Sequence, residues 1–95
     1  MEDADDTNFK TMLEWSGSTF EFIELSKALF LSKSFNEGEL TFKDLFETLC
    51  DIFNVEITYP HAAYTKMRER VDDRTLFLSK LKELVEEDMN NKDSN

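Results

Sequence analysis

The chain has 95 residues, of which 40% are hydrophobic and nine are Phe, and its formal net charge is -10. This length provides for one hydrophobic core and excludes two, so we expect a single domain. So acidic a surface repels a phosphate backbone and argues against non-specific binding to nucleic acids, whereas specific binding through one local face stays open.

The absence of a signal peptide and the single cysteine indicate the cellular compartment in which we expect the protein. The single cysteine, Cys50, cannot form an intrachain disulfide, and no basic start followed by an apolar run marks a signal peptide. The apolar runs end long before the roughly 20 residues that a membrane-spanning helix needs. We therefore expect a soluble protein in a reducing, cytoplasmic compartment, with no membrane partner.

The two ends are expected to be flexible tails, at residues 1–11 and 91–95, around one helical domain at residues 12–90. The start, MEDADDTN, and the end, NNKDSN, have almost no apolar content. A short apolar-polar alternation at residues 12–15 ends in Ser16-Gly17. It permits a brief strand followed by a turn, so a minimal two-strand β element stays open.

A capping box predicts the first helix, over residues 18–33. Ser18 and Glu21 stand three residues apart, as the reciprocal side-chain bonds of such a box require. The apolar side chains that follow form a stripe too wide for a helix that packs on one face only: Phe22, Ile23, Leu25, Leu29 and Phe30. We expect this helix to be the central and most buried one.

A second helix is predicted over residues 41–54, after a turn signal at residues 36–39. Thr41 is its expected N-cap, and Asp44 lies near the favourable end of the helix dipole. Its apolar residues recur at spacings of three, four and seven: Phe42, Leu45, Phe46, Leu49 and Phe53. This is the clearest amphipathic pattern in the chain.

Two further helices are predicted, over residues 60–71 and 74–90. Pro60 suits the first turn of a helix, where its lacking N–H costs nothing. Asp72 or Asp73 is the expected cap of the last helix. The inward residues expected on the two helices are Tyr64, Met67 and Val71, then Phe77, Leu81, Leu84, Val85 and Met89. Together the patterns predict a mainly α, compact four-helix domain.

The segment YTKMRERVDDRT, residues 64–75, belongs to the only net-positive part of the chain, since residues 59–75 sum to +1. One interpretation is a DNA-contacting face. The other is a solvated helix surface whose arginines pair with Glu69, Asp72 and Asp73. Residues 68 and 70 are about 200° apart on a helix, so Arg68 and Arg70 cannot point the same way. At most one of them can lie near the centre of a groove.

No constellation in the sequence supports an enzyme, a cofactor or a metal site. His61 is the only histidine and has no partners at metal-ligand spacing, so we interpret it as a helix-surface residue. Cys50 lies beside the stripe of the second helix and is interpreted as an inert, buried thiol. Trp15 is interpreted as a lid on the core, with an exposed binding aromatic as the alternative.

A resemblance to a known family extends this interpretation. The runs LEWSGS, FIELSKALFLSKSFNEGELTFKDLFETLCDIFNVEI and RERVDDRTLFLSKLKEL occur in that order. Together they resemble the carboxy-terminal region of the RteC family, regulators associated with conjugative elements of Bacteroides-type bacteria. The resemblance covers roughly residues 12–85. It implies helix-turn-helix or winged-helix character and binding to DNA upstream of excision genes.

The resemblance also implies candidate DNA-contacting residues, with the helix at residues 60–71 as the recognition helix. Similar proteins carry arginine at the positions of Arg68, Arg70 and Arg74. The full candidate set is Tyr64, Lys66, Arg68, Arg70, Arg74 and Thr75. For Thr75, capping of the last helix is an alternative role. DNA is thus the expected partner of a small transcriptional regulator.

Three departures from the family pattern favour a second hypothesis. Asp72 and Asp73 stand where the family tends to have lysines, and Glu86, Glu87 and Asp88 where its last helix ends in arginines. The large amino-terminal domain of the family has no counterpart here, so we expect any dimerisation or sensing that it provides either to be absent or to be supplied by another protein chain. The alternative function is a protein-interaction module that keeps the fold and has lost DNA affinity.

Overall fold

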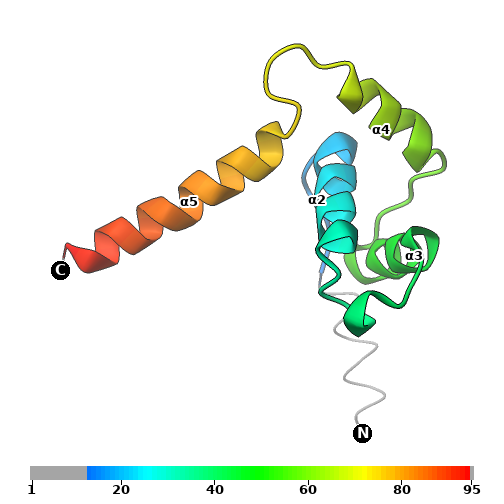
Figure 1. The fold of residues 1–95 in the computed structure, drawn as a ribbon, viewed down its shortest axis with the longest axis horizontal. Helices are drawn as coiled ribbons and strands as arrows, with labels where there is room; N and C mark the ends of the chain where they lie inside the picture. The colour runs from blue at the N-terminus through cyan, green and yellow to red at the C-terminus, as the bar shows by residue number, and fades with distance from the viewer. Residues whose placement is uncertain (1–12, 95) are drawn as a thin grey trace, which may run out of the picture.

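The computed structural model describes residues 13–94. Its elements are α2 (Thr19–Ser32), the 3-10 turn η1 (Asn36–Gly38), α3 (Phe42–Phe53), α4 (Pro60–Arg68) and α5 (Leu76–Asp93) (Figure 1). The mainly α class is confirmed. No strand forms within residues 13–94, so the alternation near Trp15 is not a strand there. The predicted tail at residues 1–11 lies outside the described residues.

Helix α2 is the central helix, as predicted. Both bonds of the capping box are present, because the Ser18 hydroxyl accepts from the Glu21 amide and the Glu21 carboxylate accepts from the Ser18 amide. Phe22 and Ile23 are fully buried, and α2 packs against α3, α4 and α5. The wide apolar stripe is therefore explained by contacts on several sides.

Helix α3 supplies the other half of the core. The Thr41 hydroxyl accepts from the Asp44 amide, which confirms the predicted cap. Leu45, Phe46 and Leu49 are buried against α2, and the rings of Phe46 and Phe22 lie 5.6 Å apart. We use "the body" below for the segment of residues 13–68 that contains α2, α3 and α4.

Helix α4 ends earlier than predicted, at Arg68, and the inward position expected for Val71 is wrong. The amides of Glu69 and Arg70 donate to carbonyls only three residues back, which tightens and ends the helix. Val71 therefore lies in the loop that follows and is 95% exposed. Tyr64 and Met67 do face the core, and Met67 is buried.

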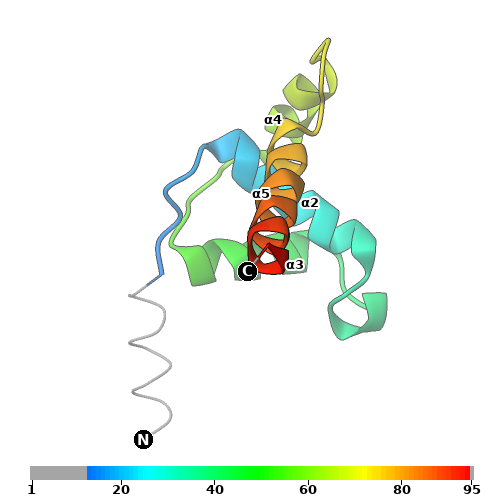
Figure 2. The same cartoon turned by 90° about the vertical axis from the view of Figure 1, so that its left-hand side faces the viewer.

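Helix α5 leaves the body instead of packing along it (Figures 1 and 2). Only its beginning is covered, where Phe77 meets the Trp15 ring at 6.0 Å. The prediction that Leu84, Val85 and Met89 point inward is wrong, since they are 50%, 53% and 58% exposed. An apolar stripe indicates that one face of a helix can be buried. It does not specify whether the same chain or another molecule covers that face.

The segment before α2 closes one side of the core. Trp15 contacts Phe22 at 5.3 Å and Phe53 at 6.2 Å, which confirms its role as a lid. Its amide donates to the Phe53 carbonyl at 2.8 Å. None of the helices within residues 13–94 combines the length and the apolar composition needed to cross a lipid bilayer.

Candidate functional site

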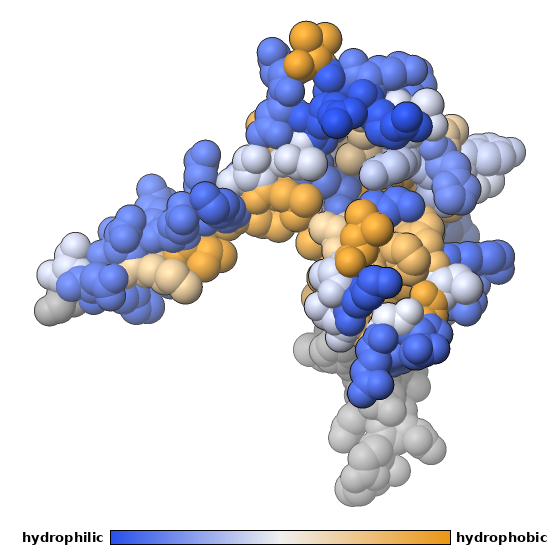
Figure 3. Space-filling model, in the orientation of Figure 1, coloured by the Kyte–Doolittle hydropathy of each residue, from blue (hydrophilic) through white to orange (hydrophobic). Residues whose placement is uncertain are grey.

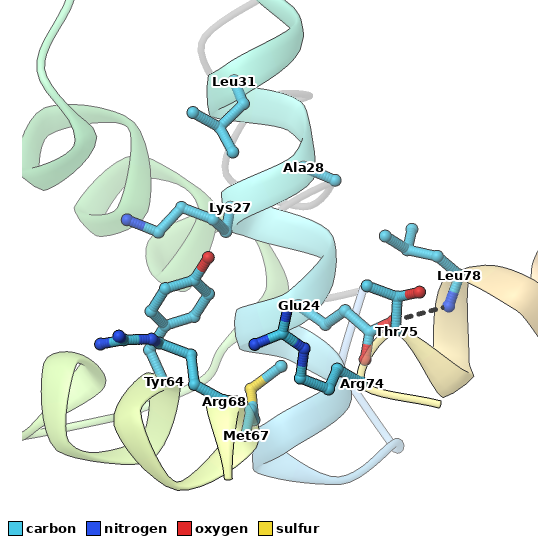
Figure 4. Close-up of a pocket in the computed structure, with 10 residues that line it drawn as sticks. All are labelled: Glu24, Lys27, Ala28, Leu31, Tyr64, Met67, Arg68, Arg74, Thr75 and Leu78. Carbon is cyan, nitrogen blue, oxygen red and sulfur yellow. Dashed lines mark hydrogen bonds between the residues drawn. The ribbon is translucent and has the colours of Figure 1, made fainter. Parts of the chain in front are cut away.

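A groove of about 460 Å³ opens between α2, α4 and the loop that leads into α5 (Figure 4). Four of the six candidate residues line it, namely Tyr64, Arg68, Arg74 and Thr75. Its other walls are Glu24, Lys27, Ala28, Leu31, Met67 and Leu78. The groove therefore joins basic side chains from three separate segments to an apolar floor.

The remaining two candidates, Lys66 and Arg70, do not line this groove. They border a second hollow together with Phe20, Met67 and Glu69. Within α4, Tyr64 and Arg68 stand four residues apart and share a side of the helix, whereas Lys66 is turned away from them. The six candidates are thus divided between two surfaces.

Arg68 and Arg74 are the exposed cations of the groove. Neither guanidinium forms an ion pair with a carboxylate of the described residues 13–94, and neither donates a side-chain hydrogen bond there. Lys27 approaches the groove from α2, with its Nζ 4.0 Å from the Phe42 ring centroid and 4.8 Å from that of Tyr64. The aromatic faces hold this ammonium group in place.

Arg70 has an internal role. Its Nη1 lies 3.6 Å from Glu24 Oε1 and donates to the Arg74 carbonyl at 3.3 Å. Its guanidinium also lies 5.9 Å from the centroid of the Phe20 ring. Pairing with Glu69, Asp72 or Asp73, one of the predicted alternatives, does not occur within ion-pair distance for any of the three arginines in the described part of the chain.

Glu24 is the site residue that the sequence analysis did not identify. Although it is a carboxylate, it is only 4% exposed. Its Oε2 accepts from the Leu78 amide at 2.8 Å, so it caps the first turn of α5 from another helix. A signal was present, because Glu24 interrupts an apolar run next to Phe22 and Ile23. A buried carboxylate needs both a cation and hydrogen-bond donors.

The start of α5 depends on Asp73, one of the two predicted caps. Its carboxylate accepts from the Ser79 hydroxyl and from both the amide and the hydroxyl of Thr75. These bonds, with the Ser79 hydroxyl first, lower the pKa of Asp73 below its usual value. Thr75 holds the N-cap position, but its side chain donates to Asp73 and makes no cap bond itself.

Of the two residues interpreted as inert, His61 has the expected environment and Cys50 has it only in part. His61 is exposed, and its ring lies 6.2 Å from that of Phe42. Cys50 is half-buried, not buried as expected, and it lines a surface hollow with Phe46 and Val55. Burial is the main cause that raises the pKa of its thiol, which favours the protonated form. Residues 13–94 contain no group of three or more His, Cys, Asp or Glu side chains that could hold a metal ion.

Comparisons with known proteins agree with the motif order. The model of the RteC protein family matches residues 2–93, which is nearly the whole chain. No curated protein and no solved structure gives a significant match. The family match extends through the body, the groove and α5. The chain therefore belongs to the RteC family.

Proposed function

We propose that this RteC-family chain is a small DNA-associated transcriptional regulator that contacts DNA with α4 and the loop after it. The observation that carries the proposal is the pair of exposed guanidinium groups, Arg68 and Arg74, which lack carboxylate partners in residues 13–94. Both lie at or after the last turn of α4. That position suits phosphate contacts better than the reading of base edges.

The order of the first three described helices supports the proposal. Helix α3 precedes α4 as the first helix precedes the recognition helix in a helix-turn-helix, and α2 packs against both, whereas α3 and α4 contact each other little. The connection at residues 54–59 is longer than the usual turn of three or four residues. The proposal assigns no catalytic role, and such a regulator would act in the cytoplasm.

The expected salt dependence of DNA binding follows from the number of cations that can reach phosphates. Arg70 is committed to Glu24, which leaves Lys66, Arg68 and Arg74. About three phosphate contacts give a slope of about -3 for log affinity against log salt concentration. Because the net charge is -10, binding should be detectable only at low salt and should favour a specific site.

Replacement of Arg68 tests the proposal directly. We expect Arg68→Ala to weaken binding to specific and unrelated duplexes alike and to reduce the magnitude of the salt slope by about one. The matched control is Lys43→Ala, which removes the same charge from α3, where Lys43 pairs only with Glu47. Fluorescence anisotropy at several salt concentrations, with a duplex from the chain's own genomic neighbourhood, measures both quantities.

Two outcomes would contradict the proposal. If the unsubstituted protein shows no binding at low salt, the interaction module without DNA affinity becomes the better hypothesis. If Arg68→Ala and Lys43→Ala weaken binding equally, the effect reflects net charge and not a contact by α4. Either result would leave the membership of the RteC family unchanged, because that rests on the sequence match.

A further inference from the structure

The second half of α5 presents an apolar face that nothing in the described chain covers. At about 100° per residue, its apolar side chains fall within an arc of about 140°. They are Phe77, Leu78, Leu81, Leu84, Val85 and Met89. The same arc also contains one charged pair, Asp88 and Lys92, whose side chains lie 3.5 Å apart. Figure 3 shows apolar side chains following the side of α5 that faces the open angle between this helix and the body. We call the exposed part, Leu84, Val85 and Met89, the α5 face.

The body of the same molecule cannot cover the α5 face in this arrangement. The Leu78 amide donates to the buried Glu24 carboxylate at 2.8 Å, which fixes the first turn of α5 on α2. Phe77 is fixed beside Trp15. From this first turn α5 runs away from the body, and its later turns are exposed (Figure 1). No segment within residues 13–94 can therefore occupy the α5 face, and we consider a second molecule as the occupant.

The charges that flank the α5 face favour a second copy of this chain as that molecule. Lys80 and Glu87 lie on one flank, and Lys82 and Glu86 on the other, where they pair with each other at 3.6 Å within one helix. Each flank has its lysine before Leu84 and its glutamate after it, at nearly equal distances along the helix. An antiparallel copy of α5 centred on Leu84 would thus place Lys80 opposite Glu87 and Lys82 opposite Glu86. A parallel copy would place like charges together.

We propose that the α5 face is a homodimer interface, in which two copies of α5 cross in antiparallel orientation at Leu84. The net charge of the chain opposes association, but the charges on α5 itself nearly balance. Residues 76–94 carry three lysines and five acidic residues, a net charge of -2 out of -10. The proposal concerns α5 and is independent of the DNA contacts proposed for α4.

The mass of the full chain in solution provides the first test. We expect a dimer at high micromolar concentration that dissociates on dilution, as measured by sedimentation or light scattering. Leu84→Asp should make the protein monomeric at every concentration. The matched control is Leu76→Asp, because Leu76 is 62% exposed on the same helix but lies outside the arc, and it should leave the dimer intact. Circular dichroism should show unchanged helix content in both variants.

Cysteine cross-linking tests the orientation. In a Cys50→Ser background, Leu84→Cys should form a disulfide-linked dimer under mild oxidation, because residue 84 meets itself at an antiparallel crossing. Met89→Cys should not, because Met89 would lie opposite the first turns of the partner helix. Cross-linking by both variants would indicate a parallel pair and overturn the proposal. A monomer at all concentrations, or a dimer that survives Leu84→Asp, would overturn it as well and assign the face to a different protein.

Discussion

The side chains of Arg70 and Glu24 form the one ion pair in residues 13–94 that involves a buried carboxylate. We expect Arg70→Ala to lower the free energy of unfolding by about 1–3 kcal/mol, because it leaves Glu24 buried without its cation. The cost stays below that of a fully buried pair, since Arg70 is 30% exposed. Urea denaturation followed by circular dichroism measures the change.

Two comparisons control this measurement. Arg68→Ala removes the same kind of side chain from a position without a carboxylate partner, and it should change stability by no more than about 0.5 kcal/mol. The double variant Glu24→Gln with Arg70→Ala should lose less than the sum of the single changes, because the two groups interact. Additive losses would show that the 3.6 Å contact contributes little to stability.

The sequence predicted part of this residue-level arrangement. Helical spacing predicted that Arg68 and Arg70 point different ways, and in the structure Arg68 is exposed and Arg70 pairs with Glu24. The predicted reason is wrong, because α4 ends at Arg68 and Arg70 lies in the loop that follows. Which arginine turns inward could not be predicted, because the choice depends on Glu24 on another helix. Sequence periodicity relates residues that are three or four positions apart. It contains no direct signal for a contact between residues as far apart in the chain as Glu24 and Arg70.

At the scale of elements, the start of α5 should respond to pH through Asp73. Its pKa in the folded protein is lowered from 3.8, so its stabilising contribution is present above that value. This contribution is lost as the pH falls through the lowered pKa. We therefore expect Asp73→Asn to be less stable than the unsubstituted chain at pH 7, and the difference to vanish under strongly acidic conditions, as measured by chemical denaturation.

Asp72 provides the matched control for that prediction. It is the neighbouring carboxylate, and no hydrogen bond or ion pair joins it to another described residue. Asp72→Asn should therefore unfold like the parent chain at every pH. If both variants behave alike, general charge repulsion and not the bonds to Thr75 and Ser79 determines the stability of this segment.

The elements themselves were predicted best where their signals are local. The caps at Ser18 and Thr41 depend on atoms three residues away, and both were confirmed. Helix α4 was predicted to end at residue 71 but ends at Arg68. Met67 and Val71 are spaced as on one face of a helix, although the backbone is no longer helical at Val71, which is exposed. Periodicity records which side chains are apolar and contains no information on where a helix stops.

For the whole molecule, the sequence predicted the core and missed the course of α5. Phe22, Phe46 and Leu49 were recognised as inward-facing because each lies on a stripe whose partner helix is nearby in the chain. The α5 stripe has the same character, but the body has already covered its own apolar surface with α2, α3 and α4. Four apolar stripes in one sequence suggested four packed helices, and the structure packs three of them with only the beginning of the fourth.

This division between body and projecting helix predicts unequal effects of two truncations of large apolar side chains. Phe46→Ala should lower the free energy of unfolding by roughly 3–5 kcal/mol through lost burial and a cavity, since Phe46 is 5% exposed. Met89→Ala should change it by no more than about 0.5 kcal/mol when the protein is dilute enough to be monomeric, because Met89 is 58% exposed. Denaturant titrations of both variants at one low concentration measure the two changes. Comparable losses would mean that α5 folds back onto the body in solution, which would remove the exposed face on which the proposed dimer depends.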